Sequence, residues 1–197
     1  MEVLSASFYA RDTVEVARDL IGKTLVRQDG PDQISGMIIE TEAYRGEEDL
    51  ACHCRAGRTP RTEIMYGPAG RAYVYLIYGM YWLLNVVTEA AGNPGAVLIR
   101  AIEPLNGVEV IAQRRAGQAR RNWTNGPGKL SLALDIQGNM NGVDICSSTG
   151  PLYITQGEDV SPEIIRTGPR VGLETVPEPW RSKEWRFMVN YQSLKGM

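Results

Sequence analysis

The sequence lacks the features that send a chain to a membrane or to the secretory route. No apolar run approaches the roughly 18 residues that a membrane-spanning helix needs. The first residues also lack the basic stretch, apolar run and small-residue cleavage site of a signal peptide. We therefore expect a protein of the cytoplasm, or of the nucleus in a eukaryote, with no membrane partner.

Cysteine and histidine are scarce, which limits disulfide and metal chemistry. The three cysteines are Cys52, Cys54 and Cys146, and His53 is the only histidine. An odd number of cysteines that includes an i, i+2 pair fits reduced thiols better than a disulfide framework. Zinc sites usually separate paired cysteines by about two to four residues and need a fourth ligand. The triplet at 52–54 meets neither condition, so we expect no metal ion.

The chain has no excess of positive charge. Its 21 Lys and Arg residues face 23 Asp and Glu residues, which gives a net charge of −2. Overall attraction would therefore not hold nucleic acid, and such a partner would need a local basic patch. With 197 residues, of which 43% are hydrophobic, the composition is that of one globular domain over residues 1–197. A chain of this size with its own core can work as a monomer, which is what we expect.

Alternation and turn signals predict a mixture of strands and short helices. Asp12, followed by Glu15, predicts a capped helix that ends at Gly22. Further short helices are predicted over 105–115 and 129–134. The predicted strands cover residues 23–27, 34–44, 72–78, 81–89, 96–103, 152–155 and 187–189. The predicted fold class is a single α+β domain with a curved, mostly antiparallel, partly barrel-like sheet surrounded by short helices.

A polar segment from residue 45 to residue 70 interrupts this pattern. It is rich in charge and glycine, and it is too irregular for a core element. Long irregular segments of compact domains often carry function. We expect a functional site near this segment.

The strand before this segment ends with Glu40, Glu42 and Tyr44. Side chains alternate along a strand, so these three share one face. Two carboxylates so close tend to raise one pKa, which suits acid or base catalysis. A solvated polar face on an edge strand is an equally simple interpretation. The only histidine follows eleven residues after Glu42 and favours the functional one, although a lone histidine is more often structural.

Four tyrosines gather around a tight turn at Gly79. Cross-strand aromatic pairs that stabilise a sheet would account for Tyr73 and Tyr81. Tyr75 shares a strand face with Tyr73. Tyr78 sits where the hairpin tip should project, and there a large ring is hard to bury but easy to insert into a partner.

Arginines lie in the same region as these tyrosines. Basic side chains interleaved with exposed aromatic rings are typical of nucleic-acid sites, where they contact phosphates and stack on bases. For each arginine taken singly, a solvated surface charge is the simpler explanation, and we prefer it for residues 114–121. We expect contacts with the DNA backbone from Arg55, Arg58, Arg61 and Lys129.

Taken together, several short motifs resemble one known family, the alkyladenine (3-methyladenine) DNA glycosylases, also called methylpurine DNA glycosylases. The matching segments are ETEAY at 40–44, GRTPR at 57–61, YVYLIYGMYWLLN at 73–85, VLIRAIEPL at 97–105 and GPGKL at 126–130. They follow the family's order and spacing over nearly the whole chain. Several motifs in register are far more specific than one.

The resemblance implies a compact domain with a curved antiparallel sheet and with neither metal nor organic cofactor. By this likeness, Glu42 is the general base that activates the attacking water and Arg100 helps to position that water. Tyr44, His53 and Tyr75 would form the walls around a base flipped out of double-stranded DNA. The implied activity is hydrolysis of the N-glycosidic bond of damaged purines, which leaves an abasic site.

The likeness assigns two further roles. Asn85 would crowd the amino group of guanine and so disfavour undamaged guanine, and Tyr78 would fill the gap left in the duplex. The sequence departs from the familiar vertebrate pattern at Cys52 and Cys54, beside His53, which leaves the range of lesions open. The candidates are 3-methyladenine, 7-methylguanine, hypoxanthine and ethenoadenine. Nothing is carried over for residues 113–125 and 138–150, where the match is weak.

Two other functions fit parts of the pattern. A non-catalytic nucleic-acid-binding protein would use the same tyrosines and arginines, but it has no need for Glu42. A small-molecule hydrolase would use Glu40 and Glu42 as a carboxylate pair. It would turn over free nucleosides and would show no salt-dependent binding of duplex DNA.

Overall fold

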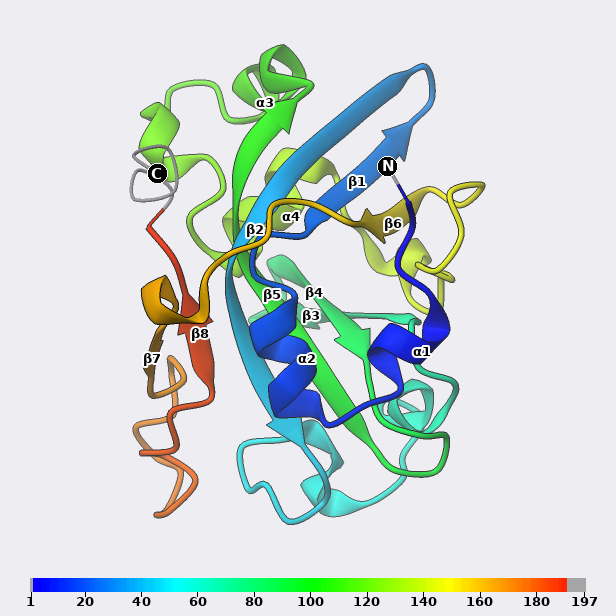
Figure 1. Cartoon of the computed structure of the whole chain (residues 1–197), viewed down its shortest axis with the longest axis vertical. Coiled ribbons are helices and arrows are strands. Elements are labelled where there is room, and N and C mark those ends of the chain that lie inside the picture. Colours follow the sequence, from blue (N-terminus) through cyan, green and yellow to red (C-terminus); the bar gives the residue numbers. More distant parts are fainter. Residues whose placement is uncertain (1, 191–197) are drawn as a thin grey trace.

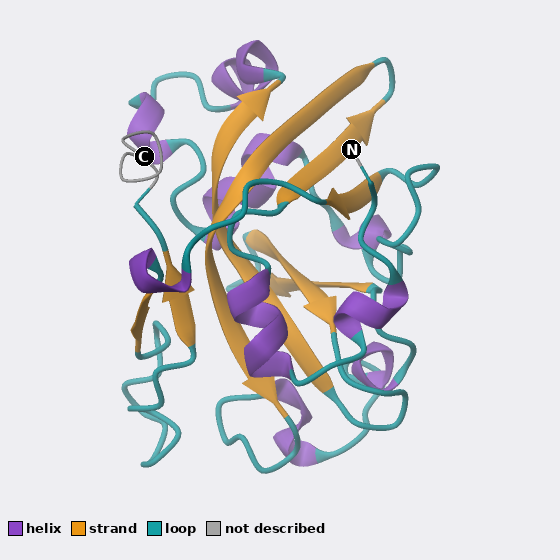
Figure 2. Cartoon of the chain, in the orientation of Figure 1, coloured by secondary structure: helices purple, strands orange, loops and turns teal. Residues whose placement is uncertain are grey.

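The computed structural model describes residues 2–190 and contains one large sheet edged by short helices (Figure 1). Its strands are β1 (Thr24–Asp29), β2 (Asp32–Arg45), β3 (Ala72–Ile77), β4 (Tyr81–Val87), β5 (Gly95–Asn106), β6 (Leu152–Thr155), β7 (Arg166–Gly168) and β8 (Arg186–Met188). The α-helices are α1 (Ala6–Tyr9), α2 (Thr13–Asp19), α3 (Val108–Arg114) and α4 (Pro127–Leu134). Loops make up much of the rest (Figure 2).

The sheet is antiparallel throughout, and β2 lies at its centre. Six strands follow the order β3-β4-β5-β2-β1-β6, while β8 pairs with β2 and β7 pairs with β8. Within residues 2–190 the end strands β3 and β6 do not pair with each other, so the sheet is open. The α+β prediction is confirmed, and so is the expected meander of β3, β4 and β5.

Helix α2 covers one face of the sheet and fixes which side chains of β2 point the other way. Its N-cap is Asp12, whose Oδ1 accepts the backbone N–H groups of Val14 and Glu15, as the sequence predicts. The helix packs on β2 and β5, where the hydroxyl of Thr41 donates to the carbonyl of Ala17 at 2.7 Å. Because side chains alternate along a strand, Glu42 points to the opposite face.

Two register shifts interrupt the pairing of β2 with β5 near the centre of the sheet. Glu40 pairs with Ala101 and Thr41 pairs with Ile99, which leaves Arg100 without a partner residue across the ladder. Such β-bulges increase the local twist and re-aim a side chain. The bulge places Arg100 beside the carboxylates of β2.

The segment from 45 to 70 is more ordered than the sequence predicts. It contains the 3₁₀ helices η1 (His53–Ala56) and η2 (Glu63–Tyr66). Cys52, Cys54 and Met65 are buried there in a second apolar cluster, which also includes Tyr73 of β3. The expectation that this segment holds no core element is wrong, because its apolar residues follow no regular period and escape pattern analysis.

Other elements differ from prediction mainly at their ends. The helix predicted from residue 105 starts at Val108, because β5 continues to Asn106 before the turn at Gly107. The strand β7 and the helix α1 are each too short to show a period. Within residues 2–190 none of the helices combines the length and the apolar character needed to cross a bilayer.

Candidate active site

A row of paired residues crosses the sheet on the face opposite α2. Tyr73 of β3 pairs with Asn85 of β4, Asn85 pairs with Leu98 of β5, and Leu98 pairs with Glu42 of β2. Directly opposed residues in antiparallel strands project from the same face. The pairing register therefore brings together side chains from four strands that are far apart in the sequence.

A cavity of about 450 Å³ lies over this row. The loop after β7, with Val171 and Leu173, and the start of α4, with Pro127, form part of its lining. Apart from these, five tyrosines and His53 form a large part of the wall. Eight residues predicted from the sequence or lying in the paired row line it: Tyr44, His53, Tyr73, Tyr75, Tyr78, Asn85, Leu98 and Arg100.

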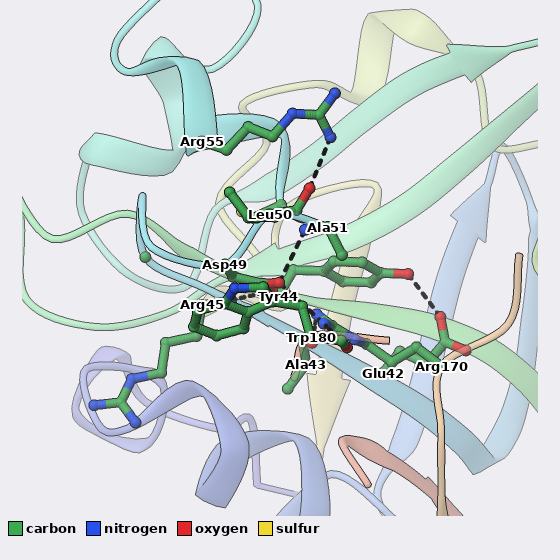
Figure 3. A network of polar contacts seen from close by, with 12 residues as sticks. Glu42, Ala43, Tyr44, Arg45, Asp49, Leu50, Ala51, Arg55, Arg170 and Trp180 are labelled. Carbon is green, nitrogen blue, oxygen red and sulfur yellow. Dashed lines mark hydrogen bonds and ion pairs between the residues drawn. The ribbon is translucent and has the colours of Figure 1, made fainter. Parts of the chain in front are cut away.

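The carboxylate of Glu42 has no exposed surface and lies just behind the cavity wall. Its Oε1 accepts the backbone N–H of Val171 at 2.7 Å, and its Oε2 accepts the hydroxyl of Tyr44 at 2.9 Å (Figure 3). A guanidinium nitrogen of Arg100 lies 3.3 Å from Oε2. All three of these partners line the cavity, so the groups that bind Glu42 form part of the wall in front of it.

Burial raises the pKa of Glu42 above the ordinary carboxyl value. Arg100, the N–H of Val171 and the hydroxyl of Tyr44 act in the opposite direction, because each favours the charged form. Glu40 adds a smaller upward contribution to the pKa. The pKa of the buried Glu42 is thus set by burial on one side and by a cation and two hydrogen-bond donors on the other.

Glu40 holds Arg100 rather than standing free beside Glu42. Its Oε1 accepts Nε of Arg100 at 2.9 Å and Nε of Arg186 at 2.6 Å. Arg100 therefore bridges the two carboxylates, and only 13% of its side chain is exposed. The two glutamates do not act as a free acid–base pair.

His53 and two tyrosines form one wall of the cavity. The imidazole Nδ1 lies 2.9 Å from the hydroxyl of Tyr73, and the ring meets Tyr75 edge-on with centroids 4.6 Å apart. A nitrogen of Arg61 lies 3.5 Å from Nε2 and donates to it, which leaves the ring proton on Nδ1. Burial, followed by the charges of Arg61 and Arg55, lowers the pKa of His53 to about 4, so the ring is neutral at physiological pH.

Tyr78 lies at the mouth of the cavity, on the tip of the β3–β4 hairpin. It is 83% exposed, and Met80 on the same tip is 64% exposed. Tyr78 and Gly79 have positive φ angles of 53° and 67°, which matches the twist of a tight hairpin turn. The hairpin therefore holds an aromatic side chain in solvent beside the opening.

The four predicted DNA-contacting cations lie in different surroundings. Arg58 is already paired with Glu63 through two hydrogen bonds of 2.7 and 2.6 Å. Arg61 lies over the ring of Tyr75, and Arg55 donates to the carbonyl of Leu50 (Figure 3). Lys129 follows the cavity-lining Pro127 and Gly128 at the start of α4.

The two cysteines beside His53 differ in their relation to the cavity, because Cys52 belongs to its lining and Cys54 does not. Their sulfur atoms are buried and lie 2.7 Å apart, and both residues are free thiols. In the part of the chain that the structure describes, no group of three or more His, Cys, Asp or Glu side chains is placed to hold a metal ion.

Sequence reasoning missed the loop after β7. Val171 supplies a donor to Glu42, and the adjacent Arg170 is buried against Asp49, a residue of the loop that follows β2. Nothing in the local sequence of this loop marks it as part of a site, because it has neither a periodic pattern nor a cluster of chemically reactive residues.

Comparison with known proteins identifies the class of this site. The model of the methylpurine-DNA glycosylase family matches residues 7–193, almost the entire chain. The chain belongs to the methylpurine-DNA glycosylase family. The recognition made from the motifs is therefore confirmed, and membership of the methylpurine-DNA glycosylases makes the chain an enzyme of DNA repair.

Relatives match over nearly their full length. A protein of Methanocella arvoryzae is 50% identical over 92% of this chain and 92% of its own. Proteins of Desulfitobacterium hafniense and Clostridium acetobutylicum are 44% and 45% identical, over 99% and 94% of this chain and 100% and 93% of theirs. Each of the three carries the name "Putative 3-methyladenine DNA glycosylase".

Proposed function

We propose that this methylpurine-DNA glycosylase flips a damaged purine out of duplex DNA into the aromatic cavity and hydrolyses its bond to deoxyribose. The observation that carries the proposal is the buried Glu42, bound by three groups that line the cavity. A protein that only bound DNA would gain nothing from a carboxylate buried at this point. The tie of Glu40 to two arginines likewise removes the free carboxylate pair that a small-molecule hydrolase would use.

The cavity walls suit a purine that carries positive charge. N-alkylation makes a purine cationic, and electron-rich rings attract a cation more strongly than a neutral base. Tyr44 would lie on one side of the flipped base, with His53 and Tyr75 on the other. Because His53 and Tyr75 touch each other, the base does not fit between those two. A neutral His53 also avoids repelling a cationic ring.

Glu42 is placed to accept a proton from the attacking water. A carboxylate offers about four acceptor positions, and Val171, Tyr44 and Arg100 occupy three of them. We propose that a water molecule takes the remaining position, where Arg100 would orient it. As the bond to the purine breaks, the sugar acquires oxocarbenium character, and the nearby negative charge stabilises it.

Two further residues fit roles in selection and flipping. Asn85 is buried on the cavity floor, where its Nδ2 donates to the carbonyl of Tyr73 at 3.1 Å and fixes the side chain. There it would crowd the amino group of guanine. Tyr78 would enter the duplex and recover part of the stacking that flipping costs.

The product we propose is an abasic site with an intact strand. Among the described residues that line the cavity there is no lysine, so no amine is placed to form the covalent intermediate of strand-cleaving glycosylases. We also propose that the enzyme works as a single domain and a monomer, in the compartment that holds the DNA. Arg55, Arg61 and Lys129 would contact phosphates, and Arg58 would have to exchange Glu63 for them.

A panel of duplexes tests this function. Each duplex carries one lesion, 3-methyladenine, 7-methylguanine, hypoxanthine or ethenoadenine, and abasic sites are counted by cleavage in alkali. We expect product from wild type on at least one lesion, none without alkali, and much less from Glu42→Gln. A chain that binds the duplexes but forms no abasic site is a non-catalytic binder, and one that acts only on free nucleosides is a small-molecule hydrolase.

A further inference from the structure

Arg170 and Asp49 form an ion pair that is fully buried behind the active site. Both oxygens of Asp49 accept from the guanidinium, and one of these bonds, from Nη2 to Oδ1, measures 2.9 Å. Neither residue lines the cavity. Removing two charges from water is costly, and buried ion pairs are often no more stabilising than apolar residues of the same size. Fold stability alone therefore gives little reason for this pair.

Arg170 fixes the position of Tyr44. Its guanidinium carbon lies over two aromatic rings, 4.8 Å from the centroid of Tyr44 and 5.1 Å from that of Trp185 (Figure 3 shows Arg170 close to Tyr44). It also donates to the carbonyl of Ala43 at 2.9 Å and to that of Trp180 at 3.1 Å. Tyr44 is thereby held both by Arg170, at its ring, and by Glu42, to which its hydroxyl donates.

Arg170 also anchors the loop that carries the second donor. Val171 comes next in the chain, and its backbone N–H donates to Glu42. Its own side chain is 46% exposed and cannot hold the loop in place. Gly172 follows with a positive φ of 78°, a conformation that glycine adopts easily. Arg170 is thus the buried anchor of a loop whose next residues are exposed or conformationally free.

We propose that Arg170 and Asp49 are positioning residues of the excision reaction, because the pair holds Tyr44 and Val171 where each donates a hydrogen bond to Glu42. Asp49 completes the arrangement by accepting the backbone N–H of Ala51 at 3.0 Å, which ties the loop after β2 to the same pair. The inference rests on the proposed function of Glu42 as the base.

The proposal predicts a change in the pH dependence of excision. Both donors favour the ionised form of Glu42, so their loss raises its pKa further and moves the acidic limb of the rate profile to higher pH. The other charged or titratable groups that face Glu42 or its partners are Glu40, Tyr75, Arg100 and Arg186. None of them contacts Arg170 or Asp49 through a hydrogen bond or an ion pair in the described structure, so their contribution to the pKa of Glu42 stays the same.

Two conservative variants test the pair. Arg170→Lys keeps the charge but loses the planar fork, and Asp49→Asn keeps the shape but loses the charge. The control is Ile154→Ala, which opens the core on β6, remote from the cavity. Release of methylated purines from methylated duplex DNA is followed between pH 4.5 and pH 8 with enzyme in excess. These pH limits reach from about one unit above neutrality to about two and a half units below it, so that the range covers the acidic limb.

We expect both variants to slow release by about 10- to 100-fold at neutral pH, with the acidic limb about one pH unit higher. Duplex affinity stays at the wild-type value, because neither residue reaches the surface. Ile154→Ala should lose thermal stability, but the acidic limb of its pH–rate profile should stay at the wild-type pH. If a single variant does not fold, Asp49→Asn combined with Arg170→Gln removes both charges and leaves no unpaired buried charge.

If the acidic limb of the pH–rate profile lies at the same pH in a folded Arg170 or Asp49 variant as in wild type, the positioning role is overturned. A shift of the same size in Ile154→Ala also overturns it, since the effect would then follow stability alone. A wild-type protein that releases no purine instead overturns the proposed function. The two failures are therefore distinguishable in one experiment.

Discussion

His53 is a neutral residue in the folded protein, and its neutrality links stability to pH. Its pKa of about 4 in the folded state compares with 6.5 in an unfolded chain. As pH falls through 6.5, His53 becomes protonated in the unfolded state, whereas in the folded state it stays neutral until pH about 4. The contribution of His53 to stability is therefore complete above pH 6.5 and is lost toward pH 4.

This difference can be measured by urea unfolding at pH 7 and pH 5. Between these values we expect the unfolding free energy of wild type to fall by about 1 kcal/mol more than that of His53→Gln, allowing for the partial exposure of the ring. Other titrating groups are common to both proteins and cancel. Equal losses in the two proteins would show that His53 does not have a lowered pKa.

Asn85 gives a second prediction at the residue scale. The shorter side chain of Asn85→Ser leaves room on the cavity floor, so release of undamaged guanine from duplex DNA should rise by about tenfold. Asn141→Ser is a matched control, because Asn141 also binds the backbone of β3, at Val74, but lies outside the cavity lining. Guanine release at background level in Asn85→Ser would remove the steric role.

Single residues were predictable where chemistry and strand alternation coincide. The alternation along β2 places Glu42 and Tyr44 on one face, and the hydrogen bond between them confirms this. The alternation along β2 cannot show that Arg100 binds Glu40, because this contact depends on a bulge at Arg100 in β5. The ion pair of the buried Arg170 was not predictable, since Asp49 lies more than a hundred residues away in the chain.

At the scale of elements, the β3–β4 hairpin presents Tyr78 to a partner. Gly79 adopts φ +67° and Gly30, in the turn between β1 and β2, adopts φ +58°, and at neither position would a Cβ atom meet a neighbour within 4 Å. Alanine at either position should therefore cost about 1–2 kcal/mol of backbone strain. Of the two positions, only Gly79 adjoins Tyr78, so only Gly79→Ala should disturb the backbone at this tyrosine.

We expect Gly79→Ala and Gly30→Ala to lower the melting temperature by similar amounts. Only Gly79→Ala should slow excision, and it should do so more for a paired lesion than for a mispaired one, because flipping a mispaired base costs less. Thermal melting and single-turnover rates on the two duplexes provide the test. Equal rates in both variants would argue against the hairpin as a wedge.

Elements with a strong period were predictable, and those held by long-range contacts were not. The alternation in β3 and β4 and the signal of Asp12 before α2 both led to observed elements. The loop after β7 takes its shape from contacts with β2, and η1 and η2 take theirs from packing around Met65. Neither cause leaves a periodic signal in the local sequence.

For the whole molecule, DNA affinity must come from a local surface, because the net charge is −2. Each phosphate contact adds about 0.9 to the slope of log affinity against log salt. Lys129→Ala should therefore reduce this slope by about 0.9. Replacing Arg58 and Glu63 together by alanine should leave it unchanged, because their charges already cancel. Titration of a lesion duplex at several salt concentrations checks both, and an unchanged slope for Lys129→Ala would exclude its phosphate contact.

The cavity is a property of the whole molecule rather than of any one motif. Its walls come from β2, η1, β3, β4, β5, η2, the β3–β4 turn, the start of α4 and the loop after β7. The sequence motifs predicted one residue from each of the first five segments, namely Tyr44, His53, Tyr75, Asn85 and Arg100, because these residues carry distinctive chemistry. The closure by α4 and by the loop after β7 follows only from the folded chain.

The most direct test of the account is the rate at which Glu42→Gln releases methylated purines from duplex DNA under single-turnover conditions. Glutamine keeps the size of the side chain but cannot take a proton from water. We predict release about 10²- to 10⁴-fold slower than wild type, with wild-type affinity for the duplex. A folded Glu42→Gln enzyme that releases the base at the wild-type rate would contradict the role of Glu42 as the catalytic base.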